Sequence, residues 1–426
     1  MGWILFGSFF ILMLISVPIG VSIGVAAVII LLISGIPLEI VPQTMFAGNN
    51  AFALVAVPFF VLVGDILARG GISEEIVAFA DATLGRLKGG LSIVSIVASM
   101  FIAAISGSGA ATTAAVGSAL IPELEKRKYD VDFSAALIAS AGTIGVVIPP
   151  SVPMVLYGVI AGESVSKLFM GGFIPGTLMG LALILIAVRM AYKKDYPKGA
   201  KVDIKTVGRL FIRALWGLIA PLIVLGGIFS GVFTPSEAAV IAVDYAIFVA
   251  FFVYKKLDLK KFYSLVVTAG VTSSLVMFVI ATAKVFGWGL AFYQIPEKIA
   301  SAMLQAVGNS SFWVFLIIDI IILIAGMFME TASSLIILTP IFLPTITKLG
   351  GNLIHFGLMV VIGLAIGMAT PPVAINIYMA SAITGLPLEK ISRRIFPMVL
   401  ALVVVLLIVT YIPSITLYLP NLILSH

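Results

Sequence analysis

One pattern of prolines and glycines occurs twice in the chain, at a fixed distance of 222 residues. Shifting the first copy by that distance, without a gap, places five of its residues on identical residues of the second copy. The pairs are Pro122 with Pro344, Gly145 with Gly367, Pro149 with Pro371, Pro150 with Pro372, and Pro175 with Pro397. Because only 21 of the 426 residues are proline, four coincident prolines at one offset indicate an internal repeat.

The composition places both copies in a membrane. Hydrophobic residues make up 61% of the chain and charged residues only 10%, whereas soluble domains carry roughly a quarter charged residues. Apolar runs of about 18 residues recur from end to end, and each is long enough to cross about 30 Å of hydrocarbon. The short alternating segments of a membrane β-barrel are missing from the sequence. We therefore predict an all-α polytopic membrane protein.

The basic residues indicate its orientation. No Lys or Arg precedes Arg69 or follows Arg394, and the densest basic stretch covers residues 189–213. By the positive-inside rule this stretch is cytoplasmic and both termini lie outside. The net charge of +6 is thus interpreted as a sign of topology rather than of nucleic-acid binding. The absence of cysteine excludes disulfides and thiolate metal sites. The start of the chain lacks the pattern of a cleaved signal peptide.

Basic residues also flank both ends of the segment 89–125. Arg86 and Lys88 precede it and residues 126–128 follow it, so the chain should leave and return on the same side. Two full spans are possible, but each arm holds only about 17 residues around a Gly/Ser/Thr tip. A re-entrant hairpin fits better, because bent backbone at membrane depth must be buried in protein or line a cavity.

Each hairpin is followed by a hydrophobic segment with a break. In the first copy, residues 133–162 are interrupted at Gly145 and at residues 149–153. The second copy has a hairpin at 311–347 and a break at 367–372. Proline removes helical hydrogen bonds, so these helices should be discontinuous. The basic flanks exchange sides between the copies, which favours inverted over parallel repeats.

The predicted divisions are scaffold helices with an amphipathic segment (1–88), the first transport repeat (89–188), a basic loop with further scaffold helices (189–310), and the second transport repeat with the last helix (311–426).

Inverted repeats with hairpins and broken helices are typical of secondary transporters, whose substrate and ion sites lie near the membrane midplane. Helix breaks leave carbonyls unpaired, and hairpin tips supply hydroxyls, so both can coordinate Na⁺, while half-helix N-termini suit a carboxylate. The predicted first Na⁺ site comprises Ser106, Gly145, Ile148 and Pro150. The predicted second Na⁺ site comprises Gly326, Thr331, Gly367 and Thr370. The predicted substrate-binding residues are Ser108, Thr112, Glu330, Ser333 and Pro372. The alternative is that these residues only permit close helix packing and kinks.

Several ionisable residues fall within apolar runs: Asp65, Asp244, Lys284, Asp319 and Glu330. Such residues are functional candidates by default. Asp65 has Arg69 four residues later, which favours a structural helix pair. Glu330, on the second tip, is the best candidate for tuning an ion or substrate site. His355 and His426 lie outside the repeated pattern, so a histidine proton relay is not expected.

Four motifs together resemble the large membrane subunit of tripartite ATP-independent periplasmic (TRAP) transporters. They are Ile105-Ser-Gly-Ser-Gly-Ala-Ala111, Gly142-Thr-Ile-Gly-Val-Val-Ile-Pro-Pro-Ser151, Gly231-Val-Phe-Thr-Pro-Ser-Glu-Ala238 and Ile337-Leu-Thr-Pro-Ile-Phe-Leu-Pro344. The resemblance covers nearly the whole chain. It implies a Na⁺-driven elevator importer of the bacterial inner membrane, with Na⁺ as coupling ion and no organic cofactor. The implied partners are a separate four-helix membrane subunit and a periplasmic substrate-binding protein. The implied substrates are organic acids such as C4-dicarboxylates or sialic acid.

The same sequence features allow alternatives to a TRAP importer. A Na⁺/dicarboxylate carrier that needs no binding protein would share the inverted-repeat architecture. Gly107-Ser-Gly109 suggests an intramembrane serine protease, but neither histidine is placed to serve as its base, and we predict no enzymatic activity. No Walker loop is present, so the chain should not hydrolyse ATP. Composition does not exclude a channel, although two paired broken-helix sites favour alternating access.

Overall fold

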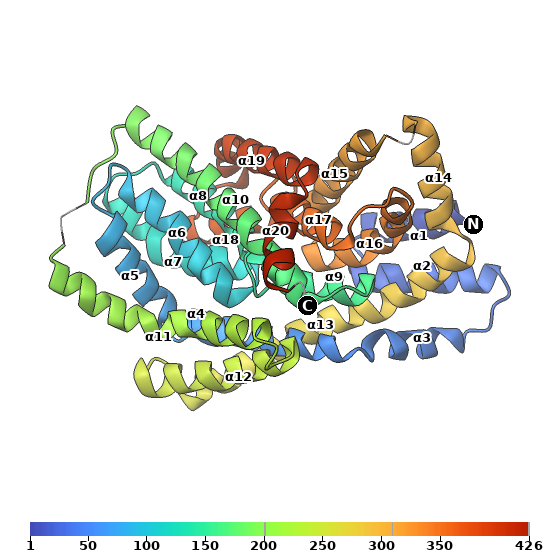
Figure 1. Cartoon of the computed structure of the whole chain (residues 1–426), viewed down its shortest axis with the longest axis horizontal. Coiled ribbons are helices and arrows are strands. Elements are labelled where there is room, and N and C mark those ends of the chain that lie inside the picture. Colours follow the sequence, from blue (N-terminus) through green and yellow to red (C-terminus); the bar gives the residue numbers. More distant parts are fainter. Residues whose placement is uncertain (200–201, 309, 425–426) are drawn as a thin grey trace.

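The structure is a computed structural model that describes residues 1–199, 202–308 and 310–424. Regular structure in these ranges is helical, apart from one antiparallel bridge between Lys88 and Lys198. Eight of the described helical segments are long and apolar enough to cross a membrane. The prediction of an all-helical, multi-span membrane protein is confirmed (Figure 1).

The first half of the chain contains ten α-helices and two 3₁₀ turns within the described ranges. They are α1 (Gly2–Leu14), α2 (Ile19–Ile33), α3 (Ile40–Asn49), η1 (Phe52–Val55), α4 (Ala56–Arg69), α5 (Ile72–Leu84), α6 (Gly90–Ser106), α7 (Gly109–Lys126), α8 (Val131–Gly142), η2 (Thr143–Val146), α9 (Val152–Ala161) and α10 (Val165–Lys193).

The second half repeats this order with fewer interruptions near its start. Its described elements are α11 (Ile204–Phe229), α12 (Pro235–Phe248) with its π-helical end η3 (Val249–Val253), α13 (Leu259–Phe292), α14 (Ile295–Val307), α15 (Ser311–Phe328), α16 (Thr331–Lys348), α17 (Leu353–Gly367), α18 (Ile375–Thr384), α19 (Leu388–Tyr411) and α20 (Ser414–Ile423).

Helix boundaries follow the spacing that the prolines predicted. A shift of 222 residues places α7 on α16 at both ends. The same shift brings α6 onto α15, α8 onto α17, α9 onto α18 and the start of α10 onto that of α19, each within a few residues. It also places α3, η1 and α4 together on the single long helix α13. The repeat therefore reaches beyond the hairpins and the breaks.

Two glycines and a serine shape the turn between α6 and α7. Gly107 ends α6 with φ +59°, a conformation that side chains rarely adopt. A Cβ atom there would lie 2.9 Å from the carbonyl oxygen of Pro150, so the tip also needs glycine for close approach to the first break. Ser108 then caps α7 by accepting a hydrogen bond from the amide of Ala111. Local sequence thus brings the tip against the break.

The first break is held by a serine hydroxyl. The α8 helix gives way to the η2 turn, and the chain then passes Pro149 and Pro150 before α9 begins. Ser151 donates from its hydroxyl to the carbonyl of Val146 at 2.6 Å and caps α9 by accepting from the amide of Met154. The second break differs, because a backbone amide rather than a side-chain hydroxyl bridges it. The backbone N–H of Asn376 donates to the carbonyl of Met368 at 3.0 Å.

Figure 1 shows the helices gathered into a broad layer, with the α6–α7 hairpin to the left of its middle and the α15–α16 hairpin to the right. The helices outside the repeated hairpins pack on one another: α2 and α3 lie against α13, α4 against α12, and α5 against α11. The centre is α17, whose residues from Ile354 to Gly367 are all buried between α15, α16 and α19. The first broken helix is buried as well, since residues 133–151 are all buried, so the helix that leads into each break lies in the interior of the molecule.

Several local predictions can be compared directly with these elements. A turn at residues 15–18 separates α1 from α2, and Thr234 and Glu237 form a capping box at the start of α12. The amphipathic segment is α5, which packs on α6 and α11. The predicted division at residue 189 falls inside α10, and three helices were not foreseen, namely α3, α14 and α20.

His355 is buried, a placement that the sequence did not predict. Its ring is 3% exposed in α17, with Nδ1 at 2.9 Å from the hydroxyl of Thr416 and Nε2 at 3.1 Å from the carbonyl oxygen of Thr410. The repeat pattern gave no sign of this, because the ring is held by the C-terminal helices rather than by its counterpart in the first copy. His426 lies outside the described residues.

Candidate functional site

A cavity of about 200 Å³ lies where the two hairpin tips meet the helices α4 and α13. Both tips contribute to its wall, together with residues from both helix breaks. The lining residues are Val61, Gly64, Asp65, Ser106, Gly107, Ser108, Gly109, Ala111, Val146, Val152, Pro153, Thr268, Thr272, Val276, Glu330, Thr331, Ala332 and Met368. The fold thus brings residues from the two copies, more than 200 positions apart, to one site.

Three oxygens cluster at the first tip. The hydroxyls of Ser106 and Thr112 are 2.8 Å apart, and the hydroxyl of Ser106 donates to the carbonyl of Ser108 at 3.3 Å. The backbone of Gly145 lies directly beside them, since a Cβ there would be 2.6 Å from both the Ser108 carbonyl oxygen and the Thr112 hydroxyl. Three neutral oxygens of the tip therefore gather directly against the backbone of the break, and oxygens of this kind can bind a small cation.

At the second tip, the backbones of the hairpin and of the helix break approach each other even more closely. A Cβ atom on Gly367 would lie 2.4 Å from the Cα of Gly326, so α15 and the end of α17 touch through glycine alone. Thr331 is 1% exposed and Ser334 is fully buried, and neither hydroxyl has a hydrogen-bond partner in the described structure. Ser334 is the counterpart of Thr112 in the repeat. Unpartnered buried hydroxyls require an explanation, and a coordinated ion would supply one.

Not all predicted site residues reach the cavity. Four of them line it: Ser106, Ser108, Glu330 and Thr331. Others lie buried behind the tips, namely Thr112, Gly145, Ile148, Pro150, Gly326, Ser333 and Gly367. Ile148 packs against Gly176 of α10, where a Cβ would be 2.4 Å from its side chain. Thr370 donates from its hydroxyl to the carbonyl of Ile366 at 2.8 Å, whereas Pro372 is exposed outside the cavity wall.

Three cavity residues were not among the predicted site residues. Asp65 forms no salt bridge with Arg69, and its side chain instead lines the cavity, half-buried. Thr268 and Thr272 approach from α13. The sequence does indicate that Thr268, Thr272 and Val276 share one face of a helix, because they follow one another at intervals of four residues.

The other intramembrane charges lie elsewhere. Asp244 and Lys284 are exposed on α12 and α13, and the stem of Lys284 packs on Gly48 of α3. Asp319 is 1% exposed in α15, and neither of its carboxyl oxygens has a hydrogen-bond partner in the described structure. It does not line the cavity, so it is not part of this site.

The charge of the cavity wall is one-sided. Asp65 and Glu330 are its ionisable lining residues, and no Lys, Arg or His lines it. A wall of carboxyls, hydroxyls and carbonyls favours cations over anions. No cluster of three or more His, Cys, Asp or Glu side chains occurs in the described ranges, so the oxygens that could hold an ion there are mainly hydroxyl and backbone oxygens.

Comparison with known proteins gives the family. The model of the "Tripartite ATP-independent periplasmic transporter, DctM component" matches residues 6–415. The chain belongs to this DctM family. It is therefore the large permease component of a TRAP transporter, and not an enzyme, as the sequence motifs predicted.

Two relatives are similar to the permease in sequence, and one solved structure is similar to it in fold. It is 41% identical over 97% of its length to the isethionate TRAP transporter permease protein DctMQ of Oleidesulfovibrio alaskensis, of which it spans 66%. It is 41% identical to the C4-dicarboxylate TRAP transporter large permease protein DctM of Pseudomonas aeruginosa, covering 94% of each chain. The YdaH transporter of Alcanivorax borkumensis superposes with a TM-score of 0.62 at 14% identity, covering 88% of each chain, which shows a shared fold.

Proposed function

We propose that this DctM permease is a Na⁺-driven importer of a small organic acid. The observation that supports this most is the cavity between the hairpin tips, whose ionisable lining residues are both acidic. An organic anion that entered this cavity would be repelled by the two carboxylates of its wall unless cations entered with it. Coupling to Na⁺ would remove that penalty, because the ion would compensate charge and bring the tips together.

The geometry of the tips supports two Na⁺ positions in this proposal. The first would use the oxygens of Ser106, Ser108 and Thr112 beside Gly145. The second would use the unpartnered hydroxyls of Thr331 and Ser334 beside Gly367. Both lie next to a helix break, and breaks of this kind can supply carbonyl ligands.

An elevator motion would move the hairpins and breaks relative to the remaining helices. In this proposal α6–α10 and α15–α19 form the transport domain, while α2–α4 and α11–α13 form the scaffold. The cavity supports this division, since its wall combines tip residues such as Ser108 with Asp65 of α4 and Thr268 of α13. The two hairpins would be re-entrant, with their tips at the midplane of the bacterial inner membrane.

The substrate and the partners are inferred from the relatives. One named relative transports isethionate and the other C4-dicarboxylates, both small acids. A cavity of about 200 Å³ is smaller than the roughly 300–1,000 Å³ of pockets for drug-sized ligands, which favours such acids over sialic acid. As in other TRAP systems, a periplasmic substrate-binding protein and a small membrane subunit would work with the permease.

Uptake into proteoliposomes tests the proposal. The permease and its small subunit would be reconstituted, and labelled succinate, isethionate and sialic acid tested in turn, each with its binding protein. Uptake that requires both an inward Na⁺ gradient and the binding protein is the expected result. Uptake driven by Na⁺ without the binding protein would instead support an ordinary Na⁺/dicarboxylate carrier. Gradient-independent flux would indicate a channel and refute coupling.

A further inference from the structure

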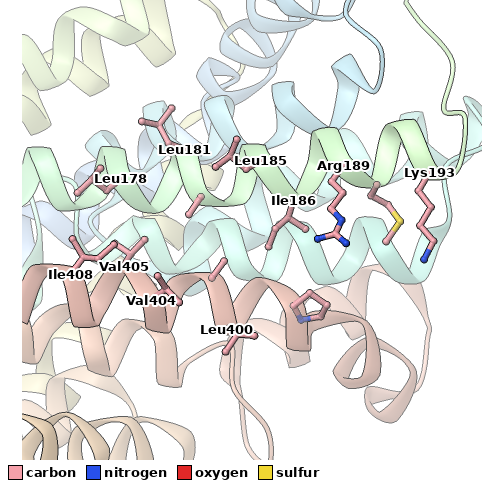
Figure 2. Close-up of a pocket in the computed structure, with 14 residues that line it drawn as sticks. Leu178, Leu181, Leu185, Ile186, Arg189, Lys193, Leu400, Val404, Val405 and Ile408 are labelled. Atoms are coloured by element: carbon pink, nitrogen blue, oxygen red, sulfur yellow. The ribbon is translucent and has the colours of Figure 1, made fainter.

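A second, larger cavity is a groove of about 810 Å³ between α10 and α19, and it shares no lining residue with the cavity at the hairpin tips (Figure 2). These two helices are counterparts in the internal repeat and pack along each other. The groove is lined by Leu178, Leu181, Ala182, Leu185, Ile186, Arg189, Met190, Lys193, Pro397, Leu400, Ala401, Val404, Val405 and Ile408. Twelve of these fourteen residues are uncharged and apolar.

The groove opens on the outer face of the helices. Leu185 is 71% exposed and Leu400 is 55% exposed, although both lie within segments long and apolar enough to cross a membrane. Large apolar side chains that stay exposed along a membrane helix face hydrocarbon. The natural occupant of the groove is therefore an apolar chain from the bilayer.

Both charged residues of the groove are basic and lie at one end. Figure 2 shows Arg189 and Lys193 together at the end of α10, with the leucines, isoleucines and valines along the rest of the groove. Neither basic residue forms a salt bridge within the described ranges. Their neighbours do, since Lys194 pairs with Asp130 at 3.1 Å and Arg394 pairs with an aspartate at 2.8 Å.

The length of the groove matches one leaflet. Its apolar part runs from Leu178 to Ile186 on α10 and from Leu400 to Ile408 on α19, which is about 12 Å at about 1.5 Å per helical residue. One leaflet supplies about half of a hydrocarbon core of roughly 30 Å. Arg189 and Lys193 then fall at headgroup depth, and the positive-inside rule places them on the cytoplasmic side.

We propose that this groove binds an anionic phospholipid of the cytoplasmic leaflet. The acyl chains lie along the apolar residues of α10 and α19, and the phosphate-bearing headgroup contacts Arg189 and Lys193. Basic pockets between membrane helices on the cytoplasmic side are suited to such headgroups, because each Lys or Arg near the surface attracts anionic lipid. The bound lipid would fill the seam between the two copies of the repeat.

Native mass spectrometry of the delipidated full chain tests this proposal. Dioleoyl phosphatidylglycerol and dioleoyl phosphatidylcholine have the same acyl chains and differ in headgroup charge. We expect the wild-type protein to bind the phosphatidylglycerol about 30-fold more tightly, since two basic residues each contribute roughly a factor of five near an anionic lipid. Equal affinity for the two lipids would overturn the proposal.

Two variants assign the binding to the groove. Arg189→Gln with Lys193→Gln should abolish the preference for phosphatidylglycerol. Lys205→Gln with Arg209→Gln, an equal loss of charge at exposed positions of α11, should preserve it. Ala401→Phe, which fills the groove, should reduce the affinity for both lipids. A preference that survives the first pair of substitutions would refute the headgroup assignment.

Photocrosslinking of the wild-type protein tests the proposal without relying on the folding of any variant. A phosphatidylglycerol with a photoreactive acyl chain should crosslink to peptides of α10 and α19, with excess unlabelled phosphatidylglycerol reducing the yield. Crosslinks spread evenly over the exposed helices would contradict a defined site. Adding the small subunit provides a further outcome: if it displaces the crosslinks, the groove is a subunit interface and the lipid assignment falls.

Discussion

Replacing Gly145 by alanine is expected to push the first hairpin tip away from the first helix break. The new Cβ atom would lie 2.6 Å from the carbonyl oxygen of Ser108 and 2.6 Å from the hydroxyl oxygen of Thr112. Ordinary contact begins near 3.4 Å, so the tip would have to withdraw by about 0.8 Å. Backbone cannot rotate away as a flexible side chain can, and the whole turn must therefore move.

The magnitude follows from the cost of overpacking. An added methyl group in a close-packed interior costs about 1–3 kcal/mol, and about 1.4 kcal/mol corresponds to a factor of ten in an equilibrium constant. The oxygens that move are those proposed to bind the first Na⁺ ion. We therefore expect the Na⁺ concentration for half-maximal uptake to rise about tenfold, together with a loss of thermal stability of about 1–3 kcal/mol.

Na⁺ activation of uptake in proteoliposomes, combined with thermal unfolding of the same preparation, measures both effects. Gly226→Ala in α11 is the matched control, because no atom outside its own helix lies within 4 Å of the added methyl group. That control should keep the wild-type Na⁺ dependence and gain stability slightly, since alanine favours helix more than glycine does. Wild-type Na⁺ activation and stability in Gly145→Ala would refute the reasoning.

Three further outcomes are expected. Ser106→Ala and Thr331→Ala should each weaken Na⁺ activation of uptake, and unchanged activation in both variants would remove these hydroxyls from the ion sites. Thr234→Ala should lower stability by about 1 kcal/mol in thermal unfolding, because it removes the capping box of α12, and an unchanged unfolding temperature would contradict this. The Lys88 ammonium, 2.5 Å away, lowers the pKa of Asp195 below 3.8, so this pair stabilises the fold above that pH and the contribution is lost as pH falls through the lowered pKa. Asp195→Asn should therefore unfold at a lower temperature than the wild type at pH 6, with the difference shrinking toward pH 3.

The sequence predicted the parts of the candidate site that depend on local backbone chemistry. The Gly/Ser/Thr tip and the double prolines at both breaks were predicted, and each acts within a few residues of chain. The structure adds the local detail that Gly107 has a positive φ and Ser108 caps α7. Their equal spacing in the two copies indicated that tips and breaks form pairs. Such features can be predicted because proline and glycine restrict the backbone wherever they occur.

Other parts of the site depend on packing between distant helices. Asp65 was assigned to a pair with Arg69, yet its helix α4 faces the tips and the carboxyl group lines the cavity. Thr268 and Thr272 share a helix face, but no local signal says what that face meets. Periodicity shows which residues lie together on a helix, and only the packing of helices shows what they face.

The sequence by itself determined the membrane class, the internal repeat, the hairpins and breaks, and the family. The first three follow from composition and from residues whose effect is local, which does not require knowledge of neighbours, whereas the family follows from the resemblance of four motifs. Only the tertiary structure decided which tips meet at the cavity, that its wall carries two carboxyls and no basic residue, and that α10 and α19 leave a groove with Arg189 and Lys193 at one end. Contacts across more than 200 residues depend on how apolar helices pack, and helices of similar hydrophobicity offer many alternative pairings.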